Sequence, residues 1–179
     1  QPLQNVYLVA AAAMSLIDSL GALDGIGLSG TQADKWYNEN ARRAMEEGRI
    51  RFAGKYSEPD YEMILSAGCP LAIESTMIYH KPEVREKLKS LGIPVFVERS
   101  GRETSPLGRT EWIKVYGVLF NKEEEARRLF DQQAAKMEEY FGKKPQVLRN
   151  SSLIYSDDIG LQASQMGFIG MLTEGAKHV

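Results

Sequence analysis

The sequence predicts an α/β protein: a lobe with a mostly parallel sheet flanked by helices, then one long α-helix and a partial second lobe. Three observations support this prediction. Short apolar runs alternate with helix-like segments through the first 120 residues, the links between them are short, and from residue 121 to residue 141 a helical period continues without a break. Such alternation is typical of strand–helix–strand units, whose strands pair in parallel.

The elements of the first lobe follow from the period of the apolar residues. Continuous β-branched or aromatic runs predict buried strands, and apolar residues every three or four positions predict helices. We expect strands at Asn5–Ala10, Gly25–Ser29, Leu71–Glu74 and Val95–Glu98. We expect helices at Ala13–Leu20, Pro59–Leu65, Pro82–Ser90 and Arg109–Phe120. The polar segment 31–50 also has helical spacing, and it is polar enough for Trp36 and Tyr37 to be exposed.

The long helix divides the predicted organisation. Asn121 stands three residues before Glu124, which is the spacing of a capping box. A helix from there to Phe141 would be about 31 Å long at 1.5 Å per residue, enough to cross a domain. A strand at Gln146–Arg149 and a short apolar helix near Phe168–Leu172 follow. We therefore expect a Rossmann-like N-terminal lobe at 1–120, a rigid linking helix at 121–142 and the beginning of a C-terminal lobe at 143–179, so that the chain is a piece of a larger protein.

Composition limits the class of partner. The 22 basic and 24 acidic side chains give a net charge of −2, which provides no bulk positive field for a nucleic acid. The longest apolar run, Val6–Met14, is too short to span a membrane as a helix. The single cysteine, Cys69, cannot form an internal disulfide, and its apolar surroundings predict a buried, inert thiol.

Standard catalytic motifs are not found in the sequence. It has no P-loop, no G-x-G-x-x-G after a strand, no G-x-S-x-G and no H-E-x-x-H, and His80 and His178 are its two histidines. Two functional classes stay open at this point, a ligand-binding protein and a Rossmann-like nucleotide-binding or enzyme domain. In either class the ligand would meet the loops at the carboxyl ends of the strands.

Two such loops contain side chains suited to ligand binding. Met77, Tyr79 and His80 follow the strand Leu71–Glu74. They either ligate haem iron or have a structural role, as the wall of a pocket or the cap of the following helix, and we favour the structural role. The loop after Val95–Glu98 brings Arg99 and Arg102 together. Guanidinium groups suit carboxylate or phosphate recognition, although an exposed loop of ion-paired arginines is an equal alternative.

An ordered set of motifs resembles a known family. The set comprises Leu20-Gly21-Ala22-Leu23-Asp24-Gly25-Ile26, Pro59 to Ile73, Leu88 to Val95, Pro106 to Ile113, and Lys122-Glu123-Glu124-Glu125-Ala126. Together these segments are similar to the substrate-binding proteins of ABC importers for iron–siderophores, haem and cobalamin, in which a single helix joins two lobes. The chain departs from the family pattern at Cys69-Pro70, where a Pro-Asp pair is usual, and this swap leaves the predicted strand intact.

The resemblance implies a function without catalysis and without a cofactor. A protein of this kind would capture an iron–siderophore, or alternatively haem or cobalamin, outside the cytoplasm. It would deliver the chelate to an ABC permease and its ATPase, and it would contact the membrane through that permease or a lipid anchor. Matching positions imply that ligand is bound by Met14, Tyr56, Ser75, Met77, Tyr79, Arg99 and Arg102. The exposed carboxylate of Glu62 would dock on arginines of the permease.

Overall fold

The computed structural model describes residues 2–141, 147–149, 161, 164–165 and 170–172. It separates into two compact units, Gln1–Phe130 and Asp131–Val179. In the second unit, β8 (Val147–Arg149) pairs in parallel with β9 (Gly170–Leu172). The strand expected at Gln146–Arg149 is therefore confirmed at residues 147–149, whereas the helix expected near Phe168–Leu172 is wrong at residues 170–172, which pair as a strand.

The first unit is built on one parallel sheet, which confirms the α/β prediction. Within residues 2–130 its strand order is β3-β2-β1-β6-β7, with all neighbours parallel. The strands are β1 (Val6–Leu8), β2 (Ile26–Ser29), β3 (Arg51–Phe52), β6 (Ala72–Glu74) and β7 (Val95–Val97). A separate two-stranded hairpin, β4 (Gly54–Lys55) with β5 (Glu58–Pro59), directly follows β3. Neither β3 nor this hairpin was expected from the sequence, because two-residue strands are too short to show a period.

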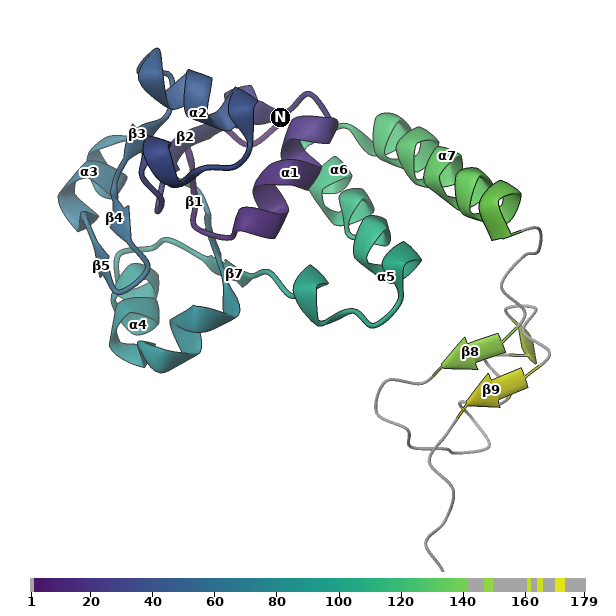
Figure 1. The fold of residues 1–179 in the computed structure, drawn as a ribbon. Coiled ribbons are helices and arrows are strands. Elements are labelled where there is room, and N and C mark those ends of the chain that lie inside the picture. Colours follow the sequence, from purple (N-terminus) through teal and green to yellow (C-terminus); the bar gives the residue numbers. More distant parts are fainter. Residues whose placement is uncertain (1, 142–146, 150–160, 162–163, 166–169, 173–179) are drawn as a thin grey trace, which may run out of the picture. The chain divides into compact units, whose positions relative to one another are not determined.

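Helices follow the strands in the expected alternation (Figure 1). They are α1 (Ala11–Ser19), α2 (Glu39–Glu46), α3 (Tyr61–Ser66), α4 (Pro82–Ser90), α5 (Pro106–Glu111), α6 (Ile113–Phe120) and α7 (Glu123–Phe141). The bounds of α4 agree with the prediction residue for residue. The single helix expected at Arg109–Phe120 is instead two helices, with Trp112 between them.

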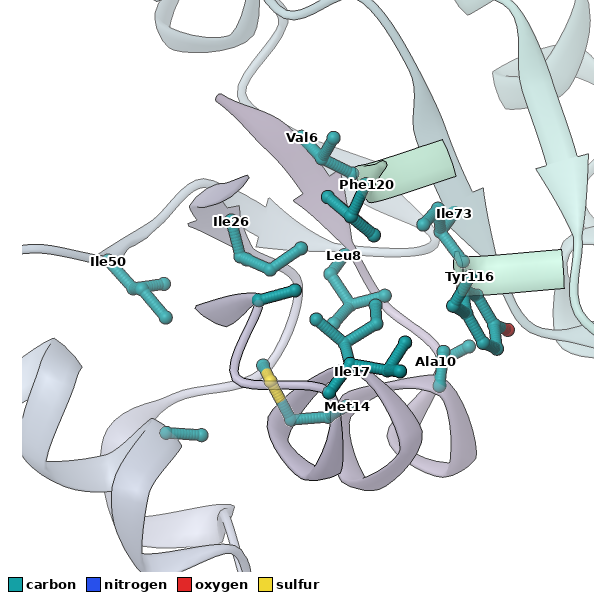
Figure 2. Close-up of a cluster of buried hydrophobic side chains, with 14 of the residues drawn as sticks. Val6, Leu8, Ala10, Met14, Ile17, Ile26, Ile50, Ile73, Tyr116 and Phe120 are labelled. Atoms are coloured by element: carbon teal, nitrogen blue, oxygen red, sulfur yellow. The ribbon is translucent and has the colours of Figure 1, made fainter. Parts of the chain in front are cut away.

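One face of the sheet packs against α1, α2 and α6. Val6 and Leu8 of β1, Ile26 of β2 and Ile73 of β6 point to this face and are almost completely buried. Helix α1 places Ile17 against Leu8, and the neighbouring α6 brings Tyr116 and Phe120 to the same cluster (Figure 2). We call this cluster the α1-side core.

The opposite face packs against α3 and α4. Tyr7, Leu28 and Ala72 are completely buried there, beneath Ile64 of α3 and Leu88 of α4. We call this cluster the α3-side core. Cys69 belongs to it, and its thiol donates to the carbonyl oxygen of Leu71 at 3.2 Å. Burial raises the pKa of this thiol, which agrees with the expected buried and inert cysteine.

Two local expectations are corrected by tertiary contacts. Asn121 is the C-cap of α6 in the left-handed conformation (φ 57°, ψ 47°) rather than an N-cap, and α7 begins at Glu123. Asparagine tolerates this conformation better than most residues, so it can end one helix shortly before the next begins.

The second correction concerns Trp36, which was expected to be exposed. Trp36 is buried, with its indole N–H donating to Ser29 Oγ at 3.1 Å, whereas its neighbour Tyr37 is fully exposed.

Helix α7 starts in close contact with α6, and a glycine permits this approach. A Cβ atom at Gly117 would lie 2.7 Å from Ala126 Cβ and 3.2 Å from the carbonyl oxygen of Lys122. Overpacking of a tight contact costs about 1–3 kcal/mol. We therefore expect Gly117→Val to lower the free energy of unfolding by about that amount in urea denaturation.

A matched control is Gly101→Val. A Cβ atom at Gly101 would meet no other atom within 4 Å. This variant should change the free energy of unfolding by no more than about 0.5 kcal/mol. Equal denaturation midpoints for the two variants would refute the close contact between α6 and α7.

Candidate functional site

The candidate site lies at the carboxyl edge of the sheet. Because the five strands are parallel, the segments that follow them meet at one edge of the sheet. The order in which the strands are added reverses between β1 and β6. At such a switch point the connections on either side diverge, and ligands bind in the crevice between them. The edge is formed by the β4–β5 hairpin and the segments 9–11, 30–31, 75–80 and 98–102.

An aromatic side chain and an arginine meet on the β6–β7 side of this edge. Arg99 donates from Nη2 to the Tyr79 hydroxyl at 2.5 Å, and its guanidinium carbon lies 5.6 Å from the centre of the Tyr79 ring. Tyr79 is 41% exposed and Arg99 is exposed as well. The two predicted residues, 20 positions apart in sequence, therefore form one accessible surface. Such a pair offers both a ring face and a positive charge to a ligand.

Two guanidinium groups at this edge have no carboxylate partner among the described residues. Neither Arg99 nor Arg102 is part of an ion pair there, although ten other pairs join described residues. Of the two readings of this loop, the structure therefore favours arginines that are available to an anion over ion-paired ones.

The loop that carries these arginines is fixed at both ends. Glu98, which is buried, accepts a hydrogen bond from the backbone N–H of Ser100 at 2.6 Å. Glu103 accepts from the Trp112 indole N–H at 3.1 Å, and its carbonyl oxygen accepts from Arg109 Nε at 2.8 Å. Anchors of this kind keep the loop close to one conformation and reduce the entropy lost on binding. Arg109 is thus occupied in holding the loop.

The other predicted ligand residues are placed as follows. Tyr56 lies half-buried in the turn of the β4–β5 hairpin, and Met77 is 46% exposed on the turn after β6. Ser75 caps that turn, since its Oγ accepts from the Met77 N–H at 3.3 Å. Met14 is different, because its side chain is 0% exposed in the α1-side core (Figure 2). Burial under the sheet keeps Met14 from facing a ligand at this edge, so we correct its assignment.

Glu62 lies outside this edge segment, in the first turn of α3. Its side chain is exposed, and the helix start is fixed by Asp60, whose Oδ1 accepts from the Met63 N–H at 2.9 Å. A carboxylate in the first turn of a helix is favourably placed relative to the helix dipole. The structure therefore presents Glu62 on a rigid surface, as docking would require, and its role stays a prediction.

A buried carboxyl group was missed by the sequence analysis. Glu74 ends β6 with 0% exposure, and neither of its carboxyl oxygens has a hydrogen-bond partner among the described residues. Loss of hydration raises the pKa of Glu74 to about 8, so that the group is mainly protonated at neutral pH. The signal in the sequence is a charged residue type at the end of the apolar run Leu71–Glu74. This signal is weak, because strand ends are usually solvated.

Strand alternation directs the buried carboxyl groups of Glu74 and Glu98 to opposite faces of the sheet. Glu74 stands two residues after Ala72, which belongs to the α3-side core. Glu98 stands two residues after Phe96, which packs against the α1-side core. Glycoside hydrolysis uses two carboxyl groups that flank one glycosidic bond. Glu74 and Glu98 do not form such a pair.

Other features of the described residues add little to this site. No group of three His, Cys, Asp or Glu side chains placed to hold a metal ion is present among them. No helix in the same part of the chain is long and apolar enough to cross a bilayer. A depression of about 180 Å³ beside Trp112, lined also by Glu103 and Val115, is smaller than a typical ligand pocket.

Solved structures define the class to which this fold belongs. A molybdate periplasmic binding protein of Haemophilus influenzae superimposes with a TM-score of 0.61 at 15% identity, over 97% of this chain and 62% of that protein. An ABC-type Fe3+-hydroxamate transport protein of Saccharomonospora viridis gives a TM-score of 0.56 at 21% identity, over 83% of this chain and 54% of that protein. The chain has the fold of periplasmic solute-binding proteins of ABC transporters, which confirms the resemblance.

Sequence comparisons add a family and a relative. The family model described as glycosyl hydrolase family 57 matches residues 38–179, and by this match the chain belongs to that family. An uncharacterized lipoprotein of Methanocaldococcus jannaschii is 30% identical over 135 residues, which are 73% of this chain. The chain spans 32% of the length of that lipoprotein.

Protonation of Glu74 predicts a pH dependence of stability. In the unfolded chain the carboxyl group loses its proton near pH 4.5, whereas in the folded protein it keeps the proton up to about pH 8. Between these values the folded state binds more protons, so this group makes the free energy of unfolding fall as pH rises, by about 1.4 kcal/mol per pH unit. We expect this component of the slope to disappear in Glu74→Gln, measured by urea denaturation at pH 5 to 8. The same change at the exposed Glu86 should leave it in place, and an unchanged slope in Glu74→Gln would contradict the assignment.

Proposed function

We propose that the chain is part of an extracytoplasmic solute-binding protein that captures an anionic metal chelate, best an iron–siderophore, for an ABC importer. The observation that carries this proposal is the Tyr79–Arg99 pair beside Arg102 at the switch-point edge of a solute-binding fold. The proposed protein is a carrier rather than an enzyme, and it passes its ligand to a permease and the ATPase of that permease.

The chemistry of the edge supports this class of ligand. Tyr56, Met77 and Tyr79 offer polarizable or aromatic surface, which suits the organic shell of a chelate. Ser75 adds a hydroxyl group, and Arg99 and Arg102 add positive charge for catecholate, hydroxamate or carboxylate oxygens. Haem has carboxylates as well, so it is the next candidate, with cobalamin after it.

The location that we propose is the periplasm or the outer cell surface, with a lipid anchor. The lipoprotein of Methanocaldococcus jannaschii and the periplasmic proteins with this fold support it. In this setting Glu62 would contact a basic site on the permease, where one carboxylate fixes orientation more than it adds affinity.

Glycoside hydrolysis is the second candidate, because the family match favours it. Within the described residues, the opposite faces to which strand alternation directs Glu74 and Glu98 argue against it. A Rossmann-like nucleotide-binding domain has less support, since the G-x-G-x-x-G spacing from Gly25 to Gly30 coincides with β2 and not with a turn between a strand and a helix.

Ligand titration tests the carrier function. We expect submicromolar binding of ferric enterobactin or haem, measured by tryptophan fluorescence or calorimetry, and weaker binding of the uncharged chelate ferrichrome. Because Arg99 supplies both a charge and its contact with Tyr79, Arg99→Ala should weaken binding at least tenfold. Arg42→Ala, which removes an exposed arginine of α2 with carboxylate partners, should leave affinity unchanged.

Failure in this titration has a clear meaning. No binding of ferric enterobactin, haem, cobalamin or molybdate would overturn the carrier proposal. Hydrolysis of an α-glucan by the same preparation would establish the second candidate in its place.

Docking has a separate test at Glu62. We expect Glu62→Arg to leave ligand affinity within twofold of wild type. Binding to the permease in proteoliposomes should fall at least tenfold, because the introduced arginine would repel the arginines of the permease. Glu86→Arg reverses an exposed charge on α4 and serves as the control. Loss of ligand affinity with permease binding retained would contradict the assignment of Glu62.

A further inference from the structure

We propose that Tyr7 is a positioning residue of the ligand site, whose buried hydroxyl holds the β4–β5 hairpin and thereby keeps Tyr56 at the carboxyl edge. This inference rests on the proposed function. It assigns a role to a residue of the central strand that does not itself face the ligand.

The hairpin has little stability of its own. Each strand has two residues, with pairs Gly54–Pro59 and Lys55–Glu58, and Tyr56 lies in the turn between them. The Lys55–Glu58 ion pair (3.2 Å) is exposed, and such pairs contribute little. An isolated two-stranded hairpin is marginal in water. Its position therefore depends on contacts with the rest of the lobe.

Tyr7 supplies such a contact from inside the lobe. Its side chain is 0% exposed in the α3-side core, and its hydroxyl donates to the carbonyl oxygen of Gly54 at 2.9 Å. Phenylalanine would fill the same apolar space, so the hydroxyl is the part of Tyr7 that packing alone does not require. The carbonyl group of Gly54, which is half-buried, also gains from a partner.

Two glycines make this contact possible. Gly54 has φ +79°, and a Cβ atom there would lie 2.3 Å from the carbonyl oxygen of Glu58. At Gly30, next to β2, a Cβ atom would lie 2.6 Å from Val9 Cγ2 and 3.2 Å from the Tyr7 hydroxyl. The missing side chains let the hairpin close and let the phenol reach it.

The donor keeps its proton under all ordinary conditions. Burial raises the pKa of Tyr7 above its usual value of 10.0, and the nearby Glu74, Tyr61 and Cys69 raise it further. These are the titratable groups that act on the Tyr7 phenol. The bond to Gly54 should therefore persist throughout the pH range in which the lobe is folded.

The test begins with Tyr7→Phe in the full chain. Hydrogen exchange followed by mass spectrometry should show exchange at least tenfold faster in the segment 53–60, with α4 and α6 unchanged. Tyr61→Phe is the matched control, since it removes a half-buried phenol hydroxyl from α3 and leaves the Gly54 contact in place. Gly30→Ala, which crowds the hydroxyl, should reproduce the effect of Tyr7→Phe.

Ligand affinity then separates positioning from stability. With ferric enterobactin as the probe, Tyr7→Phe should weaken binding about tenfold, and it should have no further effect in a Tyr56→Ala background. If Tyr7 merely stabilised the lobe, Tyr7→Phe would weaken binding by the same factor in the wild-type and the Tyr56→Ala backgrounds. That result, or unchanged exchange at 53–60 in a protein that binds the probe, would overturn the inference and leave the carrier function standing. Failure of the wild-type protein to bind any tested ligand would instead overturn the proposed function and this inference with it.

Discussion

Strand β1 is buried on both faces, and the remainder of the first unit depends on this burial. Val6 and Leu8 contact the α1-side core, whereas Tyr7 between them contacts the α3-side core, and all three are 0% exposed. Strands covered on both sides are typical of parallel sheets, in which the connections between strands supply the covering helices. The same arrangement brings the carboxyl ends of the strands together, so one packing constraint produces both the lobe and its binding edge.

The polar groups of the edge are held by neighbours that are themselves buried or anchored. Glu98 and Glu103 fix the two ends of the arginine loop, and Tyr7 contacts the hairpin. Such support keeps a site close to its binding geometry and lowers the entropic cost of association.

Glu74 shows the opposite case, a buried polar group without a partner among the described residues. Keeping it protonated lowers stability at neutral pH, since the unfolded chain ionises this group far more easily. The position borders the switch point between β1 and β6. A stability cost at such a place is typical of regions in which function has constrained the residue type.

The sequence by itself determined the alternation of strands and helices, the bounds of α4 and the edge segments that follow β1, β2, β6 and β7. These features depend on the local period of the apolar residues and on the parallel pairing of strands that are joined by helices. The tertiary structure alone decided which side chains face that edge. Met14 and Tyr79 both follow strands, yet one is buried under the sheet and the other meets Arg99 at the surface. It also placed the Tyr7 hydroxyl on the carbonyl oxygen of Gly54, because a strand period shows that a residue is buried but not what its hydroxyl reaches across 47 positions of sequence.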